Sequence, residues 1–544
     1  MTHVTVNDPG VIPFPAEREE RYRELGLWRD VTLPGALDEA AERYGSDTFV
    51  VDRSRSLSFR EVAESSRRCG VWLRAQGVCP GDNVLVYLPN SVAWVEVYFG
   101  IMRAGARPVM ALSSHGRVEL AHVARKAGAC AIVTTGRVGL TDYGATVRAV
   151  EGSLGEDRSV DDRLMAVGVI EVAVDGLRPW DECRYDGGLP RAASGDVAVL
   201  QLSGGTTGNP KLIPRLHADY EYSSRVAAEV CGLGHGDVML IVLPVSHNFV
   251  QTSPGLLGAM AVGATVVLAP DPSPSTGFGL LDSHGVTHVA LVPALLLSWM
   301  NSVQAGESEH AALRTVWVGG AKLSRAVAVR VEGELGCSLQ QVFGMAEGLC
   351  NYTRLGDDVE VVVGTQGRPL SPEDEVRVVD DAGDPVPDGV EGHLQTRGPY
   401  TITGYYRAPE HNCRSFTEDG FYISGDLVVR DARGYLTVTG RAKDIINRAG
   451  EKVAPESVEN TLLAMPEVHD ASVVGVPDDV LGEKIVAYVI LRDDCGADCR
   501  PTPRQFVMRV RRSGIAAFAV PDEVRIVDEF PLTGVGKVSK NRQR

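Results

Sequence analysis

The chain has 544 residues, of which 44% are hydrophobic and 23% charged, and its formal net charge is −17. This length predicts at least two domains, and the strong negative charge argues against a nucleic-acid partner. No apolar run is long enough to predict a membrane span, the N-terminus lacks the apolar segment of a signal peptide, and the cysteines lack metal-binding spacing, all of which favours a cytoplasmic protein.

The first two-thirds of the sequence alternates short β-branched runs with amphipathic segments. Strands are expected at 83–89, 106–112 and 129–135, with helices at 91–105 and 116–128 between them. The same rhythm predicts further strands at 196–203, 237–244, 264–269 and 287–293. Such βαβ alternation indicates an α/β fold with largely parallel sheets covered by helices.

From about residue 360 the pattern changes to short strands separated by turn residues. The segment 374–406 predicts a small antiparallel, β-barrel-like part, and 426–440 predicts a further hairpin. Beyond it the pattern is α+β, with helices expected at 454–466 and 502–514 and strands at 468–477 and 483–491. We therefore expect a large domain over 1–442 and a small C-terminal domain over 443–544.

The most distinctive stretch follows the predicted strand 196–203 and reads SGGTTGNPK at 203–211. Its glycines let backbone N–H groups approach an anion, its hydroxyls add donors and Lys211 adds a positive charge. A P-loop would need Gly-Lys followed by Ser or Thr, whereas here Asn-Pro separates Gly208 from Lys211 and Leu212 follows. The stretch therefore predicts phosphate binding of a kind other than that of P-loop ATPases.

Three further segments each carry one candidate functional group. Glu347 in VFGMAEG suits Mg²⁺, which keeps few protein ligands when it also binds phosphates. Asp426 in FYISGDL is placed after a strand and a glycine, where a carboxylate can accept hydrogen bonds from a ribose diol. Lys537 lies in GVGKVSK near the C-terminus. Each residue taken alone is more typical of an ordinary loop or surface position.

Taken together and in this order, the segments resemble the adenylate-forming superfamily, which includes acyl-CoA synthetases, luciferases and nonribosomal peptide adenylation domains. The resemblance covers almost the whole chain and rests on LSGGTTGNPK, FGMAEG, YISGDL, GRAKDIINRAGEKVAPESVE and PLTGVGKVSK. Within the superfamily, LPVSHNFVQTSPG (243–255) and QVFGMAEGLCNYTRL (341–355) are most similar to stand-alone aryl acid adenylating enzymes. Those enzymes load 2,3-dihydroxybenzoate or salicylate for siderophore-type assembly lines.

This resemblance implies a reaction in two halves. ATP would activate an ortho-hydroxy aryl acid to an aryl-AMP with pyrophosphate release, and the acyl group would then pass to the phosphopantetheine thiol of an aryl carrier protein supplied in trans. An aryl-CoA ligase is the alternative within the fold, and a non-catalytic nucleotide-binding regulator is disfavoured by intact Lys537, Glu347 and Asp426. The C-terminal domain would be mobile, with Lys443 as the hinge between the two half-reactions.

The resemblance also assigns residues to the ATP site. Lys537 matches the catalytic lysine that bridges the carboxylate and the α-phosphate, His247 is included in the catalytic set, and Glu347 matches the Mg²⁺ ligand. Phe343 is expected to stack on adenine, opposite the strand end VGGAK (318–322). The full set expected to bind the nucleotide is Ser203, Gly204, Gly205, Thr206, Thr207, Gly208, Lys211, Gly320, Ala321, Val342, Phe343, Gly344, Met345, Asp426 and Arg441.

The aryl acid is expected beside the His247–Asn248 pair. Asn248 offers an amide, which suits a phenolic ortho-hydroxyl, and the absence of an aspartate there argues against an α-amino acid. Ser253 matches the dihydroxybenzoate pattern, whereas Cys350 matches neither that pattern nor the salicylate one, so that salicylate, a methylated salicylate, 2,3-dihydroxybenzoate and a 3-hydroxyanthranilate-like acid all stay open. The expected pocket residues are Asn248, Phe249, Ser253, Gly319, Leu349 and Cys350.

Overall fold

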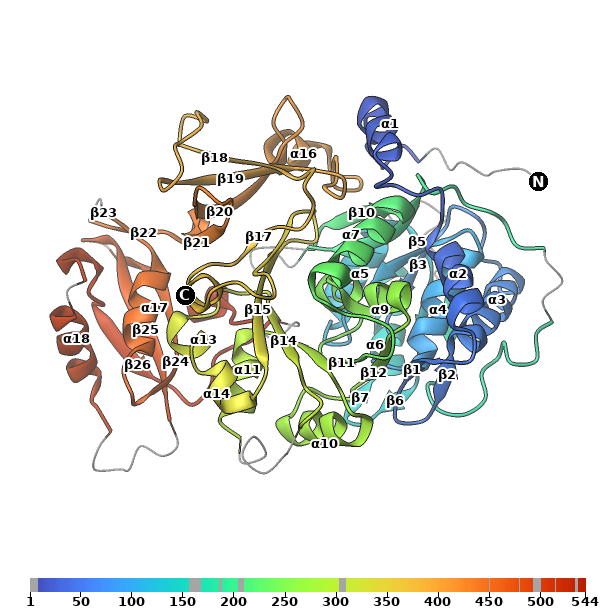
Figure 1. Cartoon of the computed structure of the whole chain (residues 1–544), viewed down its shortest axis with the longest axis horizontal. Coiled ribbons are helices and arrows are strands. Elements are labelled where there is room, and N and C mark those ends of the chain that lie inside the picture. Colours follow the sequence, from blue (N-terminus) through green and yellow to red (C-terminus); the bar gives the residue numbers. More distant parts are fainter. Residues whose placement is uncertain are drawn as a thin grey trace.

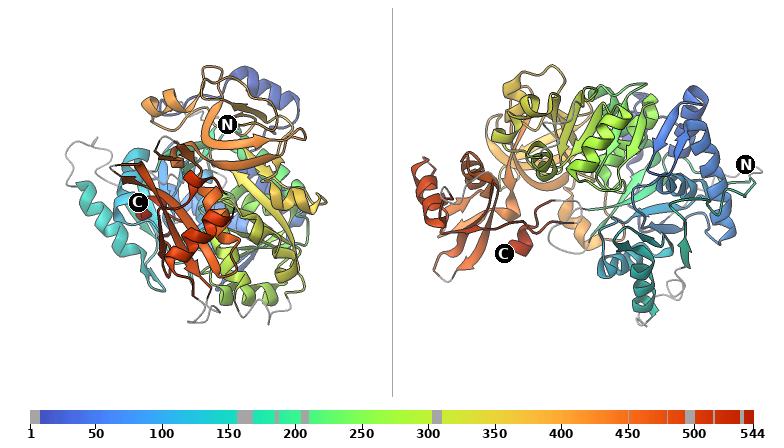
Figure 2. Two further views of the ribbon diagram at one scale, coloured as in Figure 1. Left: turned by 90° about the vertical axis from the view of Figure 1, so that its left-hand side faces the viewer. Right: turned by 90° about the horizontal axis from the view of Figure 1, so that it is seen from below.

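A computed structural model describes residues 8–155, 168–184, 188–203, 210–302, 310–449, 451–478, 480–492, 500–513, 515–533 and 537–544. Two large α/β layers come first along the chain, followed by an antiparallel sheet and a C-terminal α+β unit (Figure 1). The C-terminal unit lies at the opposite end of the molecule from helices α2 (Leu33–Tyr44) and α3 (Phe59–Ala75), as Figure 2 also shows. The predicted α/β fold with a small C-terminal α+β part is confirmed.

The first α/β layer contains a six-stranded sheet. Its order is β10 (Leu212–Leu216), β9 (Val197–Leu202), β4 (Arg107–Met110), β3 (Asn83–Val86), β5 (Ala129–Thr134) and β8 (Gly168–Glu171). Neighbouring strands are parallel except for the β9–β10 pair. Helices α4 (Val92–Arg103) and α5 (Arg117–Ala127) connect its strands, as the βαβ rhythm predicts.

The second layer contains a nine-stranded sheet. Its order is β17 (Arg368–Pro369), β16 (Cys350–Tyr352), β15 (Ser338–Gly344), β14 (Thr315–Gly319), β13 (His288–Leu291), β11 (Val238–Ile241), β12 (Thr265–Leu268), β1 (Thr48–Val51) and β2 (Ser56–Ser58). Within this order, neighbouring strands between β15 and β1 run parallel. The pairs at the two edges, β1 with β2 and β16 with β15 and β17, are antiparallel. Strands β13 and β14 are buried at every position, as expected for a sheet covered on both faces.

A four-stranded antiparallel sheet follows, in the order β18 (Glu375–Val379), β19 (Glu391–Arg397), β20 (Tyr422–Arg430) and β21 (Leu436–Arg441). Asp426 lies inside β20, opposite Arg441 of β21, so the prediction that it follows a strand is wrong. Gly425 has φ +76°, and the register with both neighbouring strands shifts nearby. A glycine bulge therefore lets the strand continue while it redirects the Asp426 side chain.

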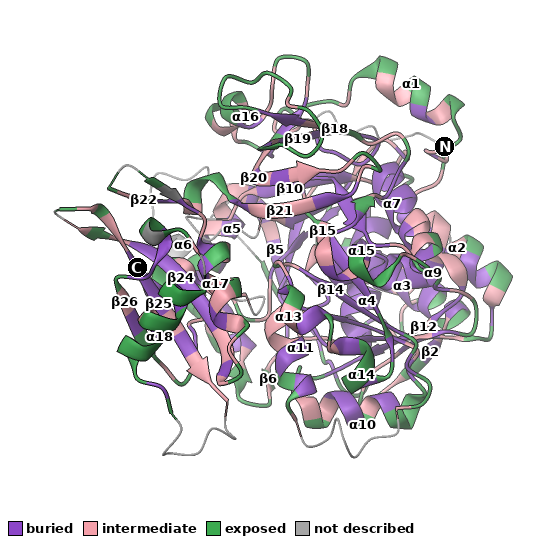
Figure 3. Ribbon diagram, turned by 60° about the vertical axis from the view of Figure 1, so that its left-hand side comes forward, coloured by how far each residue is buried: buried purple, intermediate pink, exposed green. Residues whose placement is uncertain are grey.

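The C-terminal unit has its own sheet and its own core. Its sheet joins β23 (Glu451–Val453), β22 (Ile446–Arg448), β25 (Gly482–Leu491), β24 (Val468–Asp478) and, parallel to β25, β26 (Glu523–Ile526). Helices α17 (Pro455–Leu463) and α18 (Pro503–Arg512) supply buried residues such as Val458 and Phe506 to that core. Figure 3 shows the inner strands buried and the outer face of α18 exposed.

One short turn joins the antiparallel sheet to the C-terminal unit. The 3₁₀ turn η2 (Ala442–Asp444) lies between β21 and β22, and α17 packs beside β21 and α13 (Arg325–Ala328). In the part of the chain that the structure describes, no helix is long and apolar enough to cross a membrane.

Candidate active site

The strand ends of β14 and β15 meet helix α8 (Asn248–Thr252) at one wall of the predicted aryl pocket. A Cβ built on Gly319 would lie 3.1 Å from Cζ of Phe249 and 2.9 Å from the carbonyl oxygen of Val342. The Phe249 ring therefore lies directly against the glycine, and a side chain at position 319 would have to displace it. The structure thus brings together Phe249 and Gly319, both expected in the aryl pocket, and places them beside Val342, which is expected to bind the nucleotide.

A second wall is formed around Cys350, the first residue of β16. Its Sγ lies 2.9 Å from the position of a Cβ on Gly344 and 3.9 Å from Oγ of Ser253, to which it donates a weak hydrogen bond. Burial raises the pKa of the Cys350 thiol to about 11. The thiol is therefore neutral near pH 7, which argues against a role as a nucleophile, and its contact with the aryl ring stays a prediction.

Leu349, also predicted to line the ring, is fully buried. It belongs to the hydrophobic cluster under the antiparallel sheet, where Phe343 and Met345 pack against it. The chain turns here, because the N–H of Met345 donates to the carbonyl oxygen of Leu349 at 3.1 Å. Contact of Leu349 with a ring stays a prediction, and its visible role is to anchor the turn that carries Glu347.

His247 precedes α8 and caps it. Its Nδ1 accepts a hydrogen bond from the N–H of Phe249 at 3.3 Å, so the imidazole proton is on Nε2 in the neutral ring. Burial, with the nearby charge of Lys537, lowers the pKa of His247 to about 3. The ring is therefore neutral at physiological pH and can donate one hydrogen bond from Nε2, but it is not a cationic acid.

Lys537 reaches the strand end of β14 from the C-terminal unit. Its Cε lies 3.0 Å and its Nζ 3.7 Å from the position of a Cβ on Gly320, whose φ is +84°. Burial and the charge of Arg441 lower the pKa of Lys537 to about 8, although Asp426 and Glu347 favour its charged form. Lys537 therefore lies against Gly320, close enough to Asp426, Glu347 and Arg441 for their charges to act on it.

Contacts within the C-terminal unit hold the segment that carries Lys537. The N–H of Lys537 donates to Oγ1 of Thr533 at 3.2 Å. Three residues further on, Nζ of Lys540 lies 2.8 Å from Oε1 of Glu459 on α17, which also accepts the N–H of Val473 at 2.7 Å. The lysine segment is thus tied to the helix that packs against β21 of the core.

Glu347 is buried, and a tyrosine pair supports it. The hydroxyl of Tyr405 donates to Oε1 of Glu347 at 2.7 Å and lies 3.0 Å from the hydroxyl of Tyr422. The ammonium of Lys211 lies 4.9 Å from the centre of the Tyr405 ring, and burial lowers the pKa of Lys211. No sequence pattern identifies either tyrosine as part of the site, because such an aromatic residue is indistinguishable from a core residue.

Glu347 also fits the Mg²⁺ that the family resemblance implies. Among the described residues, no three His, Cys, Asp or Glu side chains form a group that could hold a metal ion alone. Mg²⁺ bound together with substrate phosphates takes only one or two protein carboxylates. Tyr405 bonds Oε1, and Oε2 of Glu347 makes no hydrogen bond to a described residue, which is consistent with such a ligand.

Asp426 and Arg441 face each other across the β20–β21 pair. Nε of Arg441 lies 2.9 Å from Oδ1 of Asp426, whose N–H donates to Oγ of Ser424 at 3.0 Å. Burial raises the pKa of Asp426, and Arg441 opposes that shift. The carboxylate is therefore held in a fixed direction by a paired cation, which suits recognition of a diol.

Hydrogen bonds join Ser203 and Lys211, the two ends of the glycine-rich loop. The loop residues Gly204, Gly205, Thr206, Thr207 and Gly208 lie outside the described residues. The N–H of Ser203 donates to the carbonyl of Lys211 at 2.9 Å, and the N–H of Lys211 donates to Oγ of Ser203 at 3.0 Å. Burial and nearby Arg441 lower the pKa of Lys443, which lies in η2 close to this neck. The roles of the loop residues, of Ala321 and of Lys443 stay predictions.

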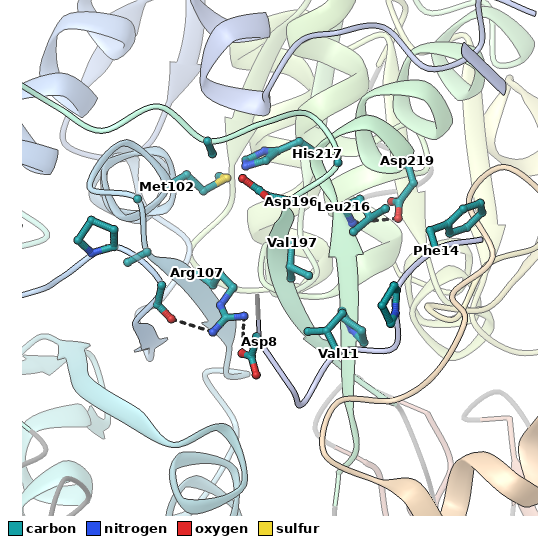
Figure 4. Close-up of a pocket in the computed structure, with 18 of the residues that line it drawn as sticks. Asp8, Val11, Phe14, Met102, Arg107, Asp196, Val197, Leu216, His217 and Asp219 are labelled. Carbon is teal, nitrogen blue, oxygen red and sulfur yellow. Dashed lines mark hydrogen bonds and ion pairs between the residues drawn. The ribbon is translucent and has the colours of Figure 1, made fainter. Parts of the chain in front are cut away.

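A separate cavity of about 430 Å³ lies away from these residues (Figure 4). It is lined by the segment 11–14, Met102 of α4, Asp196 and His217, and by an ion pair of 2.7 Å between Arg107 and Asp8. None of the predicted site residues lines it. The site is therefore identified by the convergence of its functional groups and not by cavity size.

Comparison with known proteins shows the family to which the chain belongs. The profile of the family described as AMP-binding enzyme matches residues 37–406, and that of the AMP-binding enzyme C-terminal domain matches 457–537. The chain is 44% identical to a 2,3-dihydroxybenzoate-AMP ligase of Bacillus subtilis, with 98% of this chain and 97% of the relative covered.

Two further relatives differ in the acceptor that their names give. A salicyl-AMP ligase / salicyl-S-ArCP synthetase of Mycobacterium tuberculosis is 43% identical, over 98% of this chain and 93% of the relative. A salicylyl-CoA synthase / salicylate adenylyltransferase of a Streptomyces species is also 43% identical, over 98% and 97%. The solved apo structure of Mycobacterium smegmatis MbtA is 42% identical with a TM-score of 0.72, and 98% of each chain is covered.

Proposed function

The chain belongs to the AMP-binding enzyme family, and from that premise we propose that it activates an ortho-hydroxy aryl carboxylic acid with ATP. The products of the first half-reaction are the aryl-AMP and pyrophosphate. In the second half-reaction the acyl group passes to the phosphopantetheine thiol of an aryl carrier protein, for siderophore or related nonribosomal peptide synthesis.

The position of Lys537 carries this proposal. A lysine more than a hundred residues beyond Asp426 in the chain enters the same site as Asp426 and Glu347, close to Gly320. Burying an ammonium is costly unless it meets negative charge. The bound carboxylate and α-phosphate supply that charge, so the arrangement suits a reaction in which two anions must meet.

In the first half-reaction, one carboxylate oxygen attacks the α-phosphorus. A bond forms between them, the bond from the α-phosphorus to the bridging oxygen breaks, and pyrophosphate leaves. Lys537 neutralises charge where the two anions approach, and it is held in place before the reaction by the Thr533 and Lys540 contacts. Lys211, at the neck of the glycine-rich loop, is placed to accompany the leaving pyrophosphate.

The nucleotide is held by groups from the core. Asp426 is proposed to accept the ribose hydroxyls while Arg441 keeps its carboxylate oriented. Glu347 would hold Mg²⁺, which when bound would neutralise phosphate charge. Phe343 lies at the end of β15 and is proposed to contact the adenine ring.

The aryl ring is proposed to lie between Phe249 and Cys350, with its carboxylate toward Lys537. Gly319 and Ser253 are small residues at this wall, and Asn248 would supply an amide for the ortho substituent. The curated relatives act on salicylate or on 2,3-dihydroxybenzoate, and both acids suit this pocket.

For the second half-reaction we propose that the chain divides into a core, 1–442, and a rotating unit, 443–544, with Lys443 as the hinge. The turn η2 is the connection between the two sheets, so a few dihedral changes there suffice to reorient the unit. CoA is the second candidate acceptor, because the Streptomyces relative is named a salicylyl-CoA synthase.

The test is ATP–pyrophosphate exchange over a panel of substituted benzoates, followed by acyl transfer to a phosphopantetheinylated carrier protein or to CoA. We expect exchange with salicylate or 2,3-dihydroxybenzoate and faster transfer to the carrier protein. Exchange that depends only on an α-amino acid, or no exchange with any benzoate, contradicts the proposed substrate class. Faster transfer to CoA contradicts only the acceptor.

A further inference from the structure

The side-chain amide of Asn248 is held by a tyrosine that the sequence analysis did not assign to the site. Tyr220 lies on helix α7 (His217–Val230), and its hydroxyl donates to Oδ1 of Asn248 at 2.6 Å. Tyr220 is fully buried, whereas Asn248 is partly exposed at the start of α8. The oxygen atom of the Asn248 amide is therefore held by a group from the protein interior.

Tyr220 is itself held in place by a buried ion pair. The guanidinium of Arg215 lies 4.4 Å from the centre of the Tyr220 ring and 3.0 Å from the carboxylate of Asp219. Arg215 also donates to the carbonyl oxygens of Ala346 at 2.8 Å and of Tyr400 at 3.0 Å. The tyrosine is thus anchored to the same turn that carries Glu347.

The direction of the hydrogen bond between Tyr220 and Asn248 follows from the atoms that meet, because an amide oxygen can only accept. Desolvation raises the pKa of the Tyr220 phenol well beyond the physiological range, so its proton stays in place. With that proton donated to Oδ1, the Nδ2 amide N–H₂ of Asn248 is the group left for a ligand, and it makes no hydrogen bond to a described residue. An asparagine without such a neighbour could turn its amide and offer either a donor or an acceptor.

We propose that Tyr220 is a positioning residue that fixes Asn248 as a hydrogen-bond donor, so that the aryl pocket selects acids whose ortho substituent is an acceptor. This inference rests on the proposed function and deepens it. In an ortho-hydroxybenzoate the hydroxyl donates to the adjacent carboxylate, which leaves its oxygen to accept from Nδ2. An ortho-amino group would instead place its own N–H against the N–H of Asn248 Nδ2. An unsubstituted ring would leave that Nδ2 donor without an acceptor.

The test compares ATP–pyrophosphate exchange with salicylate, 2-aminobenzoate and benzoate in the full-length enzyme. Tyr220→Phe is expected to lower the ratio of kcat/KM for salicylate over 2-aminobenzoate by about tenfold, because the amide is then free to turn. Tyr222→Phe is the matched control: it lies on the same helix, is also buried, and shares a hydrogen bond of 2.7 Å with Ser371. That control is expected to keep the wild-type ratio.

A second variant decides the question if Tyr220→Phe does not fold. In Asn248→Asp one carboxylate oxygen accepts from Tyr220 and the other faces the ligand as an acceptor, so preference should reverse toward 2-aminobenzoate. Retention of the salicylate preference in Asn248→Asp, or an equal loss with all three acids in Tyr220→Phe, overturns the inference. Absence of benzoate-dependent exchange in the wild type instead overturns the proposed function itself.

Discussion

The aryl pocket and the lysine segment lie side by side but are held in place by different interactions. The pocket wall is built from buried parallel strands and direct packing, as between Phe249 and Gly319. Lys537 instead comes from a separate unit and is placed by polar contacts such as Lys540 with Glu459. Under the proposed function, the core would therefore set the shape of the substrate, whereas a separate, rotating unit would bring the charge that the first half-reaction needs.

The largest loss of activity is expected when the positive charge of Lys537 is removed. Lys537→Ala should lower acid-dependent ATP–pyrophosphate exchange by about a hundredfold to a thousandfold, as the loss of one transition-state-stabilising group typically does. ATP binding, measured by calorimetry, should persist because Asp426 and Arg441 remain. Lys484→Ala is the control, since Lys484 pairs with Glu523 on the surface of the same unit. Equal loss in both variants would contradict the assignment.

The next effect separates the two half-reactions. Lys443→Pro fixes a backbone angle in η2, so adenylation should be spared while thiol transfer slows by about tenfold or more. The measurement is pyrophosphate exchange beside transfer to a carrier protein, on one enzyme preparation. Equal loss in both assays would show that position 443 is not a hinge for this change.

A substitution in the predicted wall of the aryl pocket should weaken binding of the aryl acid and leave binding of ATP unchanged. Gly319→Ala places a methyl group 2.9 Å from the Val342 carbonyl and 3.1 Å from Phe249, and such overpacking costs about 1–3 kcal/mol. KM for the aryl acid should therefore rise about tenfold, with KM for ATP nearly unchanged. Gly333→Ala is the control, because an added methyl group there meets open space. An unchanged KM for the acid would place the ring elsewhere.

The smallest effect is in the pH profile. The pKa of Lys537 is lowered to about 8, and the charged form is the active one, so kcat/KM for adenylation should be constant below that pH and fall as pH rises through it. Bound ATP adds negative charge near the ammonium, so the fall in kcat should lie at higher pH. A flat kcat/KM profile to pH 10 would contradict the role of the ammonium.

The sequence predicted the fold wherever the local pattern was strong. Buried strands such as β3 and β13 are short, mostly apolar runs, and the period of the helices between such strands is visible in the chain. Helix α9 (Gly255–Val262) was not assigned, because its residues are apolar on all sides and carry no period. Asp426 was misplaced relative to its strand, because a glycine bulge looks like a turn.

The site could be predicted in part because its main groups lie in recognisable segments. Glu347, Asp426 and Lys537 were found that way, and only the fold shows that they meet. Their supporting residues Tyr220 and Tyr405 were missed, because these tyrosines lie 28 and 58 residues from their partners in the chain and meet them only in the fold. Such contacts arise from tertiary packing and leave no local pattern.

The role of Lys537 in adenylation is tested most directly by supplying the Lys537→Ala variant with preformed aryl-AMP and measuring acyl transfer to a phosphopantetheinylated carrier protein. We expect transfer to proceed near the wild-type rate while salicylate-dependent pyrophosphate exchange is lost, because Lys537 is proposed to act only when the adenylate is made. Retained exchange, or loss of transfer equal to the loss of exchange, would contradict that role.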